Sequence, residues 1–129
     1  MKYYRFNEVL STNSNARDLL SVNKGTEPFC IIAEYQTSGK GQGKNKWVSD
    51  RGLNILLSYV IFPTFLQADQ NFLLSQVTAL SIFDILKDKI SEVSIKWPND
   101  ILVGSRKIAG ILIENSIMSN SINHSIIGV

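Results

Sequence analysis

The sequence of 129 residues predicts one domain of the α+β class, built on a mixed, largely antiparallel β-sheet. Its patterned segments follow one another as strand, helix, strand, loop, strand, helix and then three further strands. Because strands and helices do not alternate strictly, a purely parallel, doubly wound sheet is disfavoured. The later strands include a β-hairpin, in which two apolar runs flank a Gly104-Ser105 turn.

The first part of the chain predicts two strands and a helix, followed by a long loop. Residues 2–6 are aromatic and favour a strand. Ser11-Thr12-Asn13 offers caps for a helix over residues 13–23, which Gly25 would end. Residues 29–35 form an apolar run short enough for a buried strand. Residues 36–46 contain three glycines and three lysines and predict a loop.

The second part predicts the longest helix and the remaining strands. Residues 53–62 read as a strand that Pro63 closes, and residues 69–90 as a helix with Asp69 as its cap. Strands are expected over 93–97, 101–103 and 106–114, then a polar stretch over 115–123. The apolar run 126–129 ends with the last residue, which suggests a chain cut from something longer.

Composition excludes several classes of protein. A formal net charge of +2 is too small to indicate a nucleic-acid or membrane surface. The single cysteine, Cys30, excludes an intrachain disulfide and reads as a buried hydrophobe. No apolar stretch or N-terminal leader is long enough for a membrane or secretory segment, so a cytoplasmic location is expected. A lone histidine, His124, argues against Ser-His-Asp or Cys-His hydrolysis, and no His/Cys cluster suggests zinc.

The loop over residues 39–47 is rich in glycine and lysine and ends at Trp47. Glycines let backbone N–H groups approach an anion closely, and lysines without acidic neighbours add positive charge. Its spacing fits neither the Walker nor the Rossmann phosphate fingerprint. The alternatives are an anion-binding loop and a solvated, flexible hairpin tip. Trp47 is either a core anchor or a surface on which a nucleobase stacks.

Two lysines stand near the strands of the predicted hairpin. Alternation along residues 93–97 puts Lys96 on the polar face, where it could simply be solvated or pair with Asp100. Lys107 precedes Ala109 and Gly110, whose small size permits close approach by a neighbour or ligand. Fixed cations and backbone amides without a protein nucleophile suit a reaction that depends on positioning and electrostatics.

Five motifs in order resemble the catalytic domain of biotin protein ligases. They are Ser11-Thr12-Asn13, Glu34 to Gly41 with Trp47, Lys96-Trp97-Pro98-Asn99-Asp100, Lys107 to Glu114, and Ile126-Ile127-Gly128-Val129. The resemblance covers essentially the whole chain. It implies the biotin–lipoate ligase catalytic core, a class II synthetase-like fold with helices packed on one side of the sheet.

The resemblance also implies a two-step reaction. The biotin carboxylate attacks the α-phosphate of ATP to give biotinyl-5′-AMP and pyrophosphate, and a lysine of a biotin carrier domain then takes the biotinyl group. Biotin, ATP, Mg²⁺ and the carrier domain are the implied ligands and partners, with no membrane or nucleic-acid partner and with a homodimer left open. The alternatives are a lipoate or octanoyl ligase of the same fold and an inactive, truncated module that binds biotin or a carrier.

The resemblance assigns site residues position by position. Lys107 matches the central catalytic lysine, between the biotin carboxylate and the α-phosphate. Mg²⁺ would be held by phosphates, with Asn99 or Asp100 as the protein ligand. The implied biotin-binding set is Ser11, Thr12, Asn13, Gln36, Gly39, Lys40, Lys107 and Gly110. The implied nucleotide-binding set is Lys40, Gln42, Lys44, Asn45, Trp47, Lys96, Asn99, Asp100 and Lys107.

The chain departs from the family pattern in two places. The common loop is Gly-Arg-Gly-Arg-x-Gly-Arg-x-Trp, whereas Gln42 and Asn45 replace its second and third arginines and Lys44 its third glycine. Lysines do not grip phosphate with two parallel hydrogen bonds as arginines do, although Lys44 and Lys46 offer compensating charge. The family also continues past this end into a Gly-Ile/Leu-Asn segment and a small β domain, which are missing here. With no winged-helix segment before the domain, a repressor role is not implied.

Overall fold

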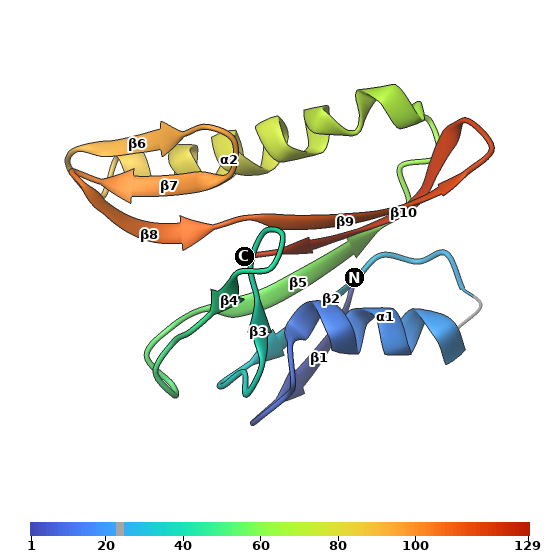
Figure 1. Cartoon of the computed structure of the whole chain (residues 1–129), viewed down its shortest axis with the longest axis horizontal. Helices are drawn as coiled ribbons and strands as arrows, with labels where there is room; N and C mark the ends of the chain where they lie inside the picture. Colours follow the sequence, from blue (N-terminus) through green and yellow to red (C-terminus); the bar gives the residue numbers. More distant parts are fainter. Residues whose placement is uncertain (23–24) are drawn as a thin grey trace.

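A five-stranded, mixed β-sheet forms the centre of the protein. The computed structural model describes residues 1–22 and 25–129 (Figure 1). Five strands lie in the order β1-β2-β5-β10-β9. The β1–β2 pair is parallel and the other pairs are antiparallel. Their bounds are β1 Lys2–Phe6, β2 Phe29–Ala33, β5 Leu56–Ile61, β9 Leu112–Met118 and β10 Ser121–Gly128.

Helix α1 (Thr12–Val22) covers one face of this sheet. Ala16 is fully buried against a cluster contributed by the three central strands. The cluster brings together Phe29, Ile31, Val60 and Ile126 from neighbouring strands. This packing fixes the first turn of α1 above the strands that line the cavity.

The opposite face of the sheet is covered by α2 (Phe72–Lys87) and a three-stranded sheet, β6-β7-β8. Ile127 packs in this second cluster, whereas its neighbour Ile126 packs under α1, because successive strand residues point to opposite faces. The two helices therefore flank the sheet, as Figure 1 shows with α1 below and α2 above. The expectation that both helices pack on one side is wrong. The bounds of the smaller sheet are β6 Val93–Lys96, β7 Asp100–Val103 and β8 Arg106–Gly110.

The structure confirms the strand over residues 2–6, the first helix and the hairpin around Gly104-Ser105. The predicted end of that helix at Asn23 lies outside the described residues. The strand expected over 29–35 ends at Ala33, and the one expected over 53–62 begins only at Leu56. Gly52 has φ 70° and its N–H donates to the carbonyl of Glu34, so the chain is still turning there.

Two later expectations need correction, and the polar stretch has a regular structure. The second helix is α2 preceded by a short 3₁₀ turn, η1 (Ala68–Gln70), which contains Asp69, so Asp69 does not cap the helix. The strand expected over 106–114 is broken at Ile111, whose N–H and carbonyl both bond to Asn99 while the chain passes from one sheet to the other. The polar stretch 115–123 is itself the β9–β10 hairpin, turned at Ser119 with φ 56°.

Within the described residues, no helix is long and apolar enough to cross a membrane.

Candidate functional site

A polar cavity opens where the first turn of α1, the end of β10 and the β8–β9 junction meet. A tiny hairpin of β3 (Gly39–Lys40) and β4 (Lys46–Trp47) closes it from a third side. The lining therefore comes from parts of the chain that lie far apart in sequence. It consists of Ser11, Thr12, Asn13, Gln36, Lys40, Gly41, Gln42, Trp47, Asn99, Lys107, Gly110, Ile111, Leu112, Gly128 and Val129.

One wall of the cavity carries neutral hydrogen-bonding groups. Ser11 and Thr12 are almost fully buried at the start of α1. The Gln36 Oε1 atom accepts hydrogen bonds from the Thr12 backbone N–H at 2.7 Å and from its Oγ1 hydroxyl at 3.1 Å. These bonds occupy the carbonyl end of the Gln36 amide, which leaves its NH₂ end as a donor. The wall thus resembles a fixed row of neutral groups suited to an uncharged polar ligand.

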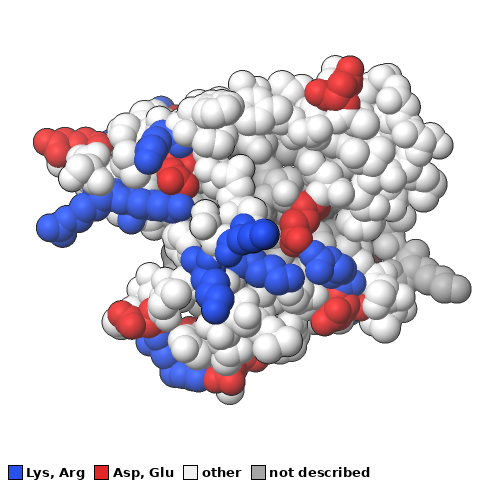
Figure 2. Space-filling model, in the orientation of Figure 1, with Lys and Arg blue, Asp and Glu red and all other residues white. Residues whose placement is uncertain are grey.

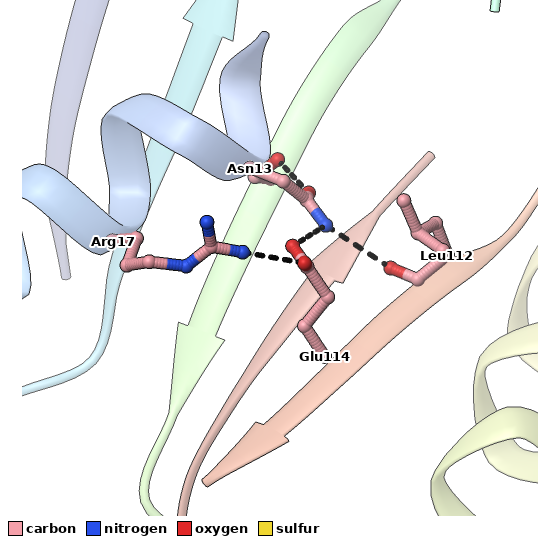
Figure 3. A network of polar contacts seen from close by, with 5 residues as sticks. Asn13, Arg17, Leu112 and Glu114 are labelled. Carbon is pink, nitrogen blue, oxygen red and sulfur yellow. Dashed lines mark hydrogen bonds and ion pairs between the residues drawn. The ribbon is translucent and has the colours of Figure 1, made fainter. Parts of the chain in front are cut away.

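Asn13 lies in the same wall, but the protein occupies both ends of its side chain. Its Nδ2 donates to Glu114 Oε2 at 2.9 Å (Figure 3). Its Oδ1 accepts a hydrogen bond from Ser58 Oγ at 2.5 Å. The residue is buried, with only 2% of its surface exposed. Asn13 therefore lines the cavity while its polar atoms bond to the surrounding strands.

The opposite wall supplies a cation. Lys107 on β8 places Nζ 2.7 Å from Asp100 Oδ1 on β7 and 5.2 Å from the centre of the Trp47 ring. A Cβ on Gly110 would lie 2.9 Å from Lys107 Cε and 3.0 Å from Trp47 Cζ3, so a glycine is what lets the lysine and the indole meet. The Lys107 side chain is 40% exposed and its ammonium remains accessible to a ligand.

Asn99 fixes the corner between these walls. Its Nδ2 donates to the Ile111 carbonyl at 3.0 Å, and its own carbonyl accepts the Ile111 N–H at 2.8 Å. The two bonds hold the chain where β8 passes into β9. One N–H of the Asn99 amide is used in this way, and Oδ1 is the atom of this side chain that could bind a metal.

Positive charge gathers on the rim of the cavity. Lys and Arg side chains cluster near the centre of the face in Figure 2, over the β3–β4 hairpin. A second hollow lies beside the cavity on this hairpin, and Lys40 lines both. Gly39, Lys44, Asn45 and Glu114 line the second hollow only. The predicted phosphate-facing loop therefore occupies the edge of the site rather than its floor.

Of the predicted nucleotide-binding residues, Lys96 and Asp100 line neither hollow. Asp100 still contacts the Lys107 ammonium, whereas Lys96 is exposed and faces Asp100 across the β6–β7 pair. Conversely, the sequence predicts no site role for Ile111, Leu112 and Gly128, which line the cavity, or for Glu114. Gly128 carried a usable signal, because a lone glycine inside an apolar strand often marks close approach by another group.

Among residues 1–22 and 25–129, no group of three or more His, Cys, Asp and Glu side chains is placed to hold a metal ion. Burial raises the pKa of the Cys30 thiol, so this cysteine stays protonated inside the sheet, as expected of a buried hydrophobe.

The fold and the cavity together define an α+β domain in which a wall of neutral hydrogen-bonding groups faces a lysine and an indole. Residues 6–129 match the Biotin/lipoate A/B protein ligase family. The chain belongs to this family.

Named relatives agree with this assignment. The bifunctional ligase/repressor BirA of Bacillus subtilis is 27% identical over 125 residues, which cover 96% of this chain and 38% of that protein. The biotin--[acetyl-CoA-carboxylase] ligase of Paracoccus denitrificans is 36% identical over 111 residues, or 82% of this chain and 44% of that protein. The chain thus spans less than half the length of either relative.

Solved structures confirm the predicted α+β core. The biotin protein ligase of Leishmania major in complex with biotinyl-5-AMP superposes with a TM-score of 0.76 at 26% identity, covering 98% of this chain and 56% of that one. The ligase of Aquifex aeolicus in complex with biotin and ATP gives 0.75 at 27% identity, with 99% and 51% covered.

Proposed function

We propose that this domain is the catalytic core of an ATP-dependent biotin–protein ligase. In this reaction a carboxylate oxygen of biotin attacks the α-phosphorus of ATP, pyrophosphate leaves, and biotinyl-5′-AMP forms. A lysine amine of a carrier domain then attacks the acyl carbon and AMP leaves. The observation that carries the proposal is the single cavity that joins the Thr12–Gln36 wall to the Lys107 ammonium.

Each wall suits one end of such a substrate. The Gln36 NH₂ group and the buried hydroxyls of Ser11 and Thr12 match the uncharged ureido ring of biotin, which needs hydrogen-bond partners without a counter-charge. Lys107 lies across the cavity, where it would face both the biotin carboxylate and the α-phosphate that this carboxylate attacks. Both groups are anionic, so a fixed cation reduces their repulsion and stabilises charge that develops on the phosphoryl oxygens.

The ion pair with Asp100 holds the Lys107 ammonium group in a fixed position. Asp100 is mostly buried and holds Nζ at 2.7 Å, so the ammonium does not have to be ordered when substrates arrive. The Trp47 ring, whose centre lies 5.2 Å from Nζ, offers a flat apolar surface for adenine. Stacking of a base on an indole contributes about 1–3 kcal/mol.

Magnesium fits this site only through the phosphates of ATP. The second oxygen of Asp100 and the Oδ1 atom of Asn99 are the nearby hard ligands, since the other polar atoms of both side chains are engaged. Bound there with the nucleotide, Mg²⁺ would neutralise phosphate charge. Mg²⁺ characteristically binds through one or two carboxylates together with substrate phosphates, which agrees with this sparse set of ligands.

The loop over residues 39–47, which differs from the family pattern, should determine how tightly the nucleotide binds. Lys40 and Gln42 reach the cavity itself, while Lys44 and Asn45 line the neighbouring hollow. Point charges on lysines attract phosphates without the bidentate geometry of arginine. We therefore expect nucleotide binding that weakens steeply with added salt.

The family also includes lipoate ligases, which supports a second candidate, a lipoyl- or octanoyl-type acid in place of biotin. The acidic end would still meet Lys107, but such an acid lacks the ureido ring. The donor group of Gln36 separates the two, because only biotin has an acceptor for it. Competition between biotin and lipoate for the wild-type site decides between these acids.

The direct test combines calorimetry with biotin and ATP and mass spectrometry for biotinyl-5′-AMP. Lys107→Met should reduce adenylate formation by about 10²–10³-fold, the usual cost of losing a group that stabilises the transition state. Lys87→Met removes a lysine of the same kind from an exposed pair on α2 and serves as the matched control. No biotin binding by the wild-type protein would refute the proposal. Binding without adenylate would favour the inactive binding module.

The carrier domain, a cytoplasmic location and a homodimer complete the proposal. Mass spectrometry of a biotinylated carrier lysine would test the first of these, cell fractionation the second and sedimentation the third.

A further inference from the structure

Asn13 sits over a row of three residues that runs across the sheet. Ser58, Gly128 and Leu112 are register partners on β5, β10 and β9. The Asn13 side chain bonds Ser58 Oγ at 2.5 Å and the Leu112 carbonyl at 3.5 Å. Gly128 lies between them, and a Cβ there would come within 2.4 Å of Asn13 Oδ1. The absent side chain is what admits Asn13 to the sheet.

Glu114 binds the same helix twice. Its Oε2 accepts a hydrogen bond from Asn13 at 2.9 Å, and its Oε1 pairs with Arg17 Nη2 at 2.5 Å (Figure 3). Asn13 and Arg17 are four residues apart and so lie on one face of α1. Strand alternation turns Glu114 toward that face, since its register partner is Ile126 of the cluster under α1. One carboxylate thus fastens the first turns of α1 to β9.

Holding Asn13 in place also holds the adjacent Thr12–Gln36 wall of the cavity. Thr12 precedes Asn13, and its N–H and hydroxyl both bond to the Gln36 side chain. The direction of the free Gln36 NH₂ group therefore depends on where the first turn of α1 is held. Neither Glu114 nor Arg17 lines the cavity, so both act on it only through other groups.

We propose that Glu114 is a positioning residue for ligand recognition: through Asn13, supported by Arg17, it holds the Thr12–Gln36 wall in its binding geometry. The assignment of biotin as the ligand rests on the proposed function, whereas the positioning of Thr12 and Gln36 does not. Glu114 also lines the hollow beside the basic loop. Removing its negative charge should not weaken binding of an anionic nucleotide there. Loss of Glu114 should therefore raise the Kd for biotin without raising the Kd for ATP.

The test compares four variants with the wild-type protein. Glu114→Ala removes both bonds, Glu114→Gln keeps an acceptor for Asn13 but loses the ion pair, and Arg17→Ala loses only the ion pair. Asp84→Ala removes an exposed ion pair on α2, across the sheet, as the matched control. Calorimetry should give a biotin Kd raised about tenfold for Glu114→Ala, less for Glu114→Gln and Arg17→Ala, and unchanged for Asp84→Ala. The Kd for ATP should be unchanged or lower in all four.

A second readout needs no ligand. The Thr12 amide bonds to the Gln36 side chain, so its hydrogen exchange reports the geometry of the wall directly. Exchange at Thr12 should accelerate in Glu114→Ala while α2 amides keep their wild-type rates. Equal loss of biotin and ATP affinity, or wild-type exchange at Thr12 in Glu114→Ala, would overturn the inference. If the wild-type protein binds no biotin, the proposed function fails and the exchange rates still decide the positioning role.

Discussion

Replacing Gly128 with alanine tests the close contact between helix α1 and the sheet. The new Cβ would stand 2.4 Å from Asn13 Oδ1 and 3.1 Å from its Cγ, with backbone on one side and a buried helix turn on the other. Relief of this overlap requires Asn13 to move away from Ser58. Overpacking costs about 1–3 kcal/mol, and the buried hydrogen bond to Ser58 adds about 1 kcal/mol. We therefore expect Gly128→Ala to lower the free energy of unfolding by about 2–4 kcal/mol.

Urea unfolding measures this loss as a lower midpoint with an unchanged slope. For a chain of this length about 1 kcal/mol corresponds to roughly 4 °C, so Tm should fall by about 8–16 °C. Gly25→Ala is the matched control, because a Cβ at Gly25 meets no atom within 4 Å, and its effect should stay within about 0.5 kcal/mol.

A double mutant identifies the contact responsible. Asn13→Ala removes the atoms that Gly128→Ala would strike, so in that background the alanine at 128 should cost less than about 1 kcal/mol. Fully additive costs would refute the reasoning, because residues that do not touch each other contribute independently. Wild-type stability of the single Gly128→Ala variant would refute it as well.

Three further outcomes follow from the structure. Gln36→Ala should weaken biotin by about tenfold, the loss of one or two hydrogen bonds, and leave a lipoyl-type acid nearly unaffected; equal losses for both acids in calorimetry would contradict the proposed ring contact. Trp47→Ala should weaken ATP by about 1–3 kcal/mol in the same assay, and an unchanged Kd would exclude stacking. Burial lowers the pKa of His124 below its usual 6.5, so the folded state resists its protonation and loses stability as the pH falls through about 6.5. His124→Gln should lose less stability over that interval, measured by urea unfolding at pH 7.5 and 5.5, and parallel losses would show that His124 does not contribute.

Much of the fold follows from local signals in the sequence. The hairpin around Gly104-Ser105 was predictable because two apolar runs enclose a turn, and the structure gives Gly104 a φ of 56°. Asp69 misled because a good cap residue stands just before an apolar helical pattern, whereas the chain first makes a 3₁₀ turn. Helix placement on both faces of the sheet depends on which neighbour each strand residue meets, and a single sequence does not state that.

The site was predictable where chemistry and spacing coincide and unpredictable where polar groups hold one another. Lys107 and Gln36 carry exposed or free polar groups, and the structure brings them to one cavity. The Asn13 side chain carries an amide that could bind a ligand, yet this amide forms hydrogen bonds with Ser58 and Glu114 instead. Residues 115–123 were identified from the sequence only as a polar stretch, whereas in the structure they belong to a hairpin whose polar side chains pair across strands, as Asn115 and Ser125 do at 2.7 Å. Such pairings become visible only once the strand register is known.

The most direct test of the biotin site is a nitrogen-15 NMR titration of the protein with biotin. We expect the signals of the Gln36 side-chain amide and the Thr12 backbone amide to shift in step with one bound biotin per chain, while the signals of α2 amides stay unchanged. Lys107→Met should weaken biotin binding in this titration while the same amides shift, because the Lys107 cation contacts only the carboxylate end of biotin. Shifts that avoid Thr12 and Gln36, or no shifts at all, would contradict the assignment of this cavity.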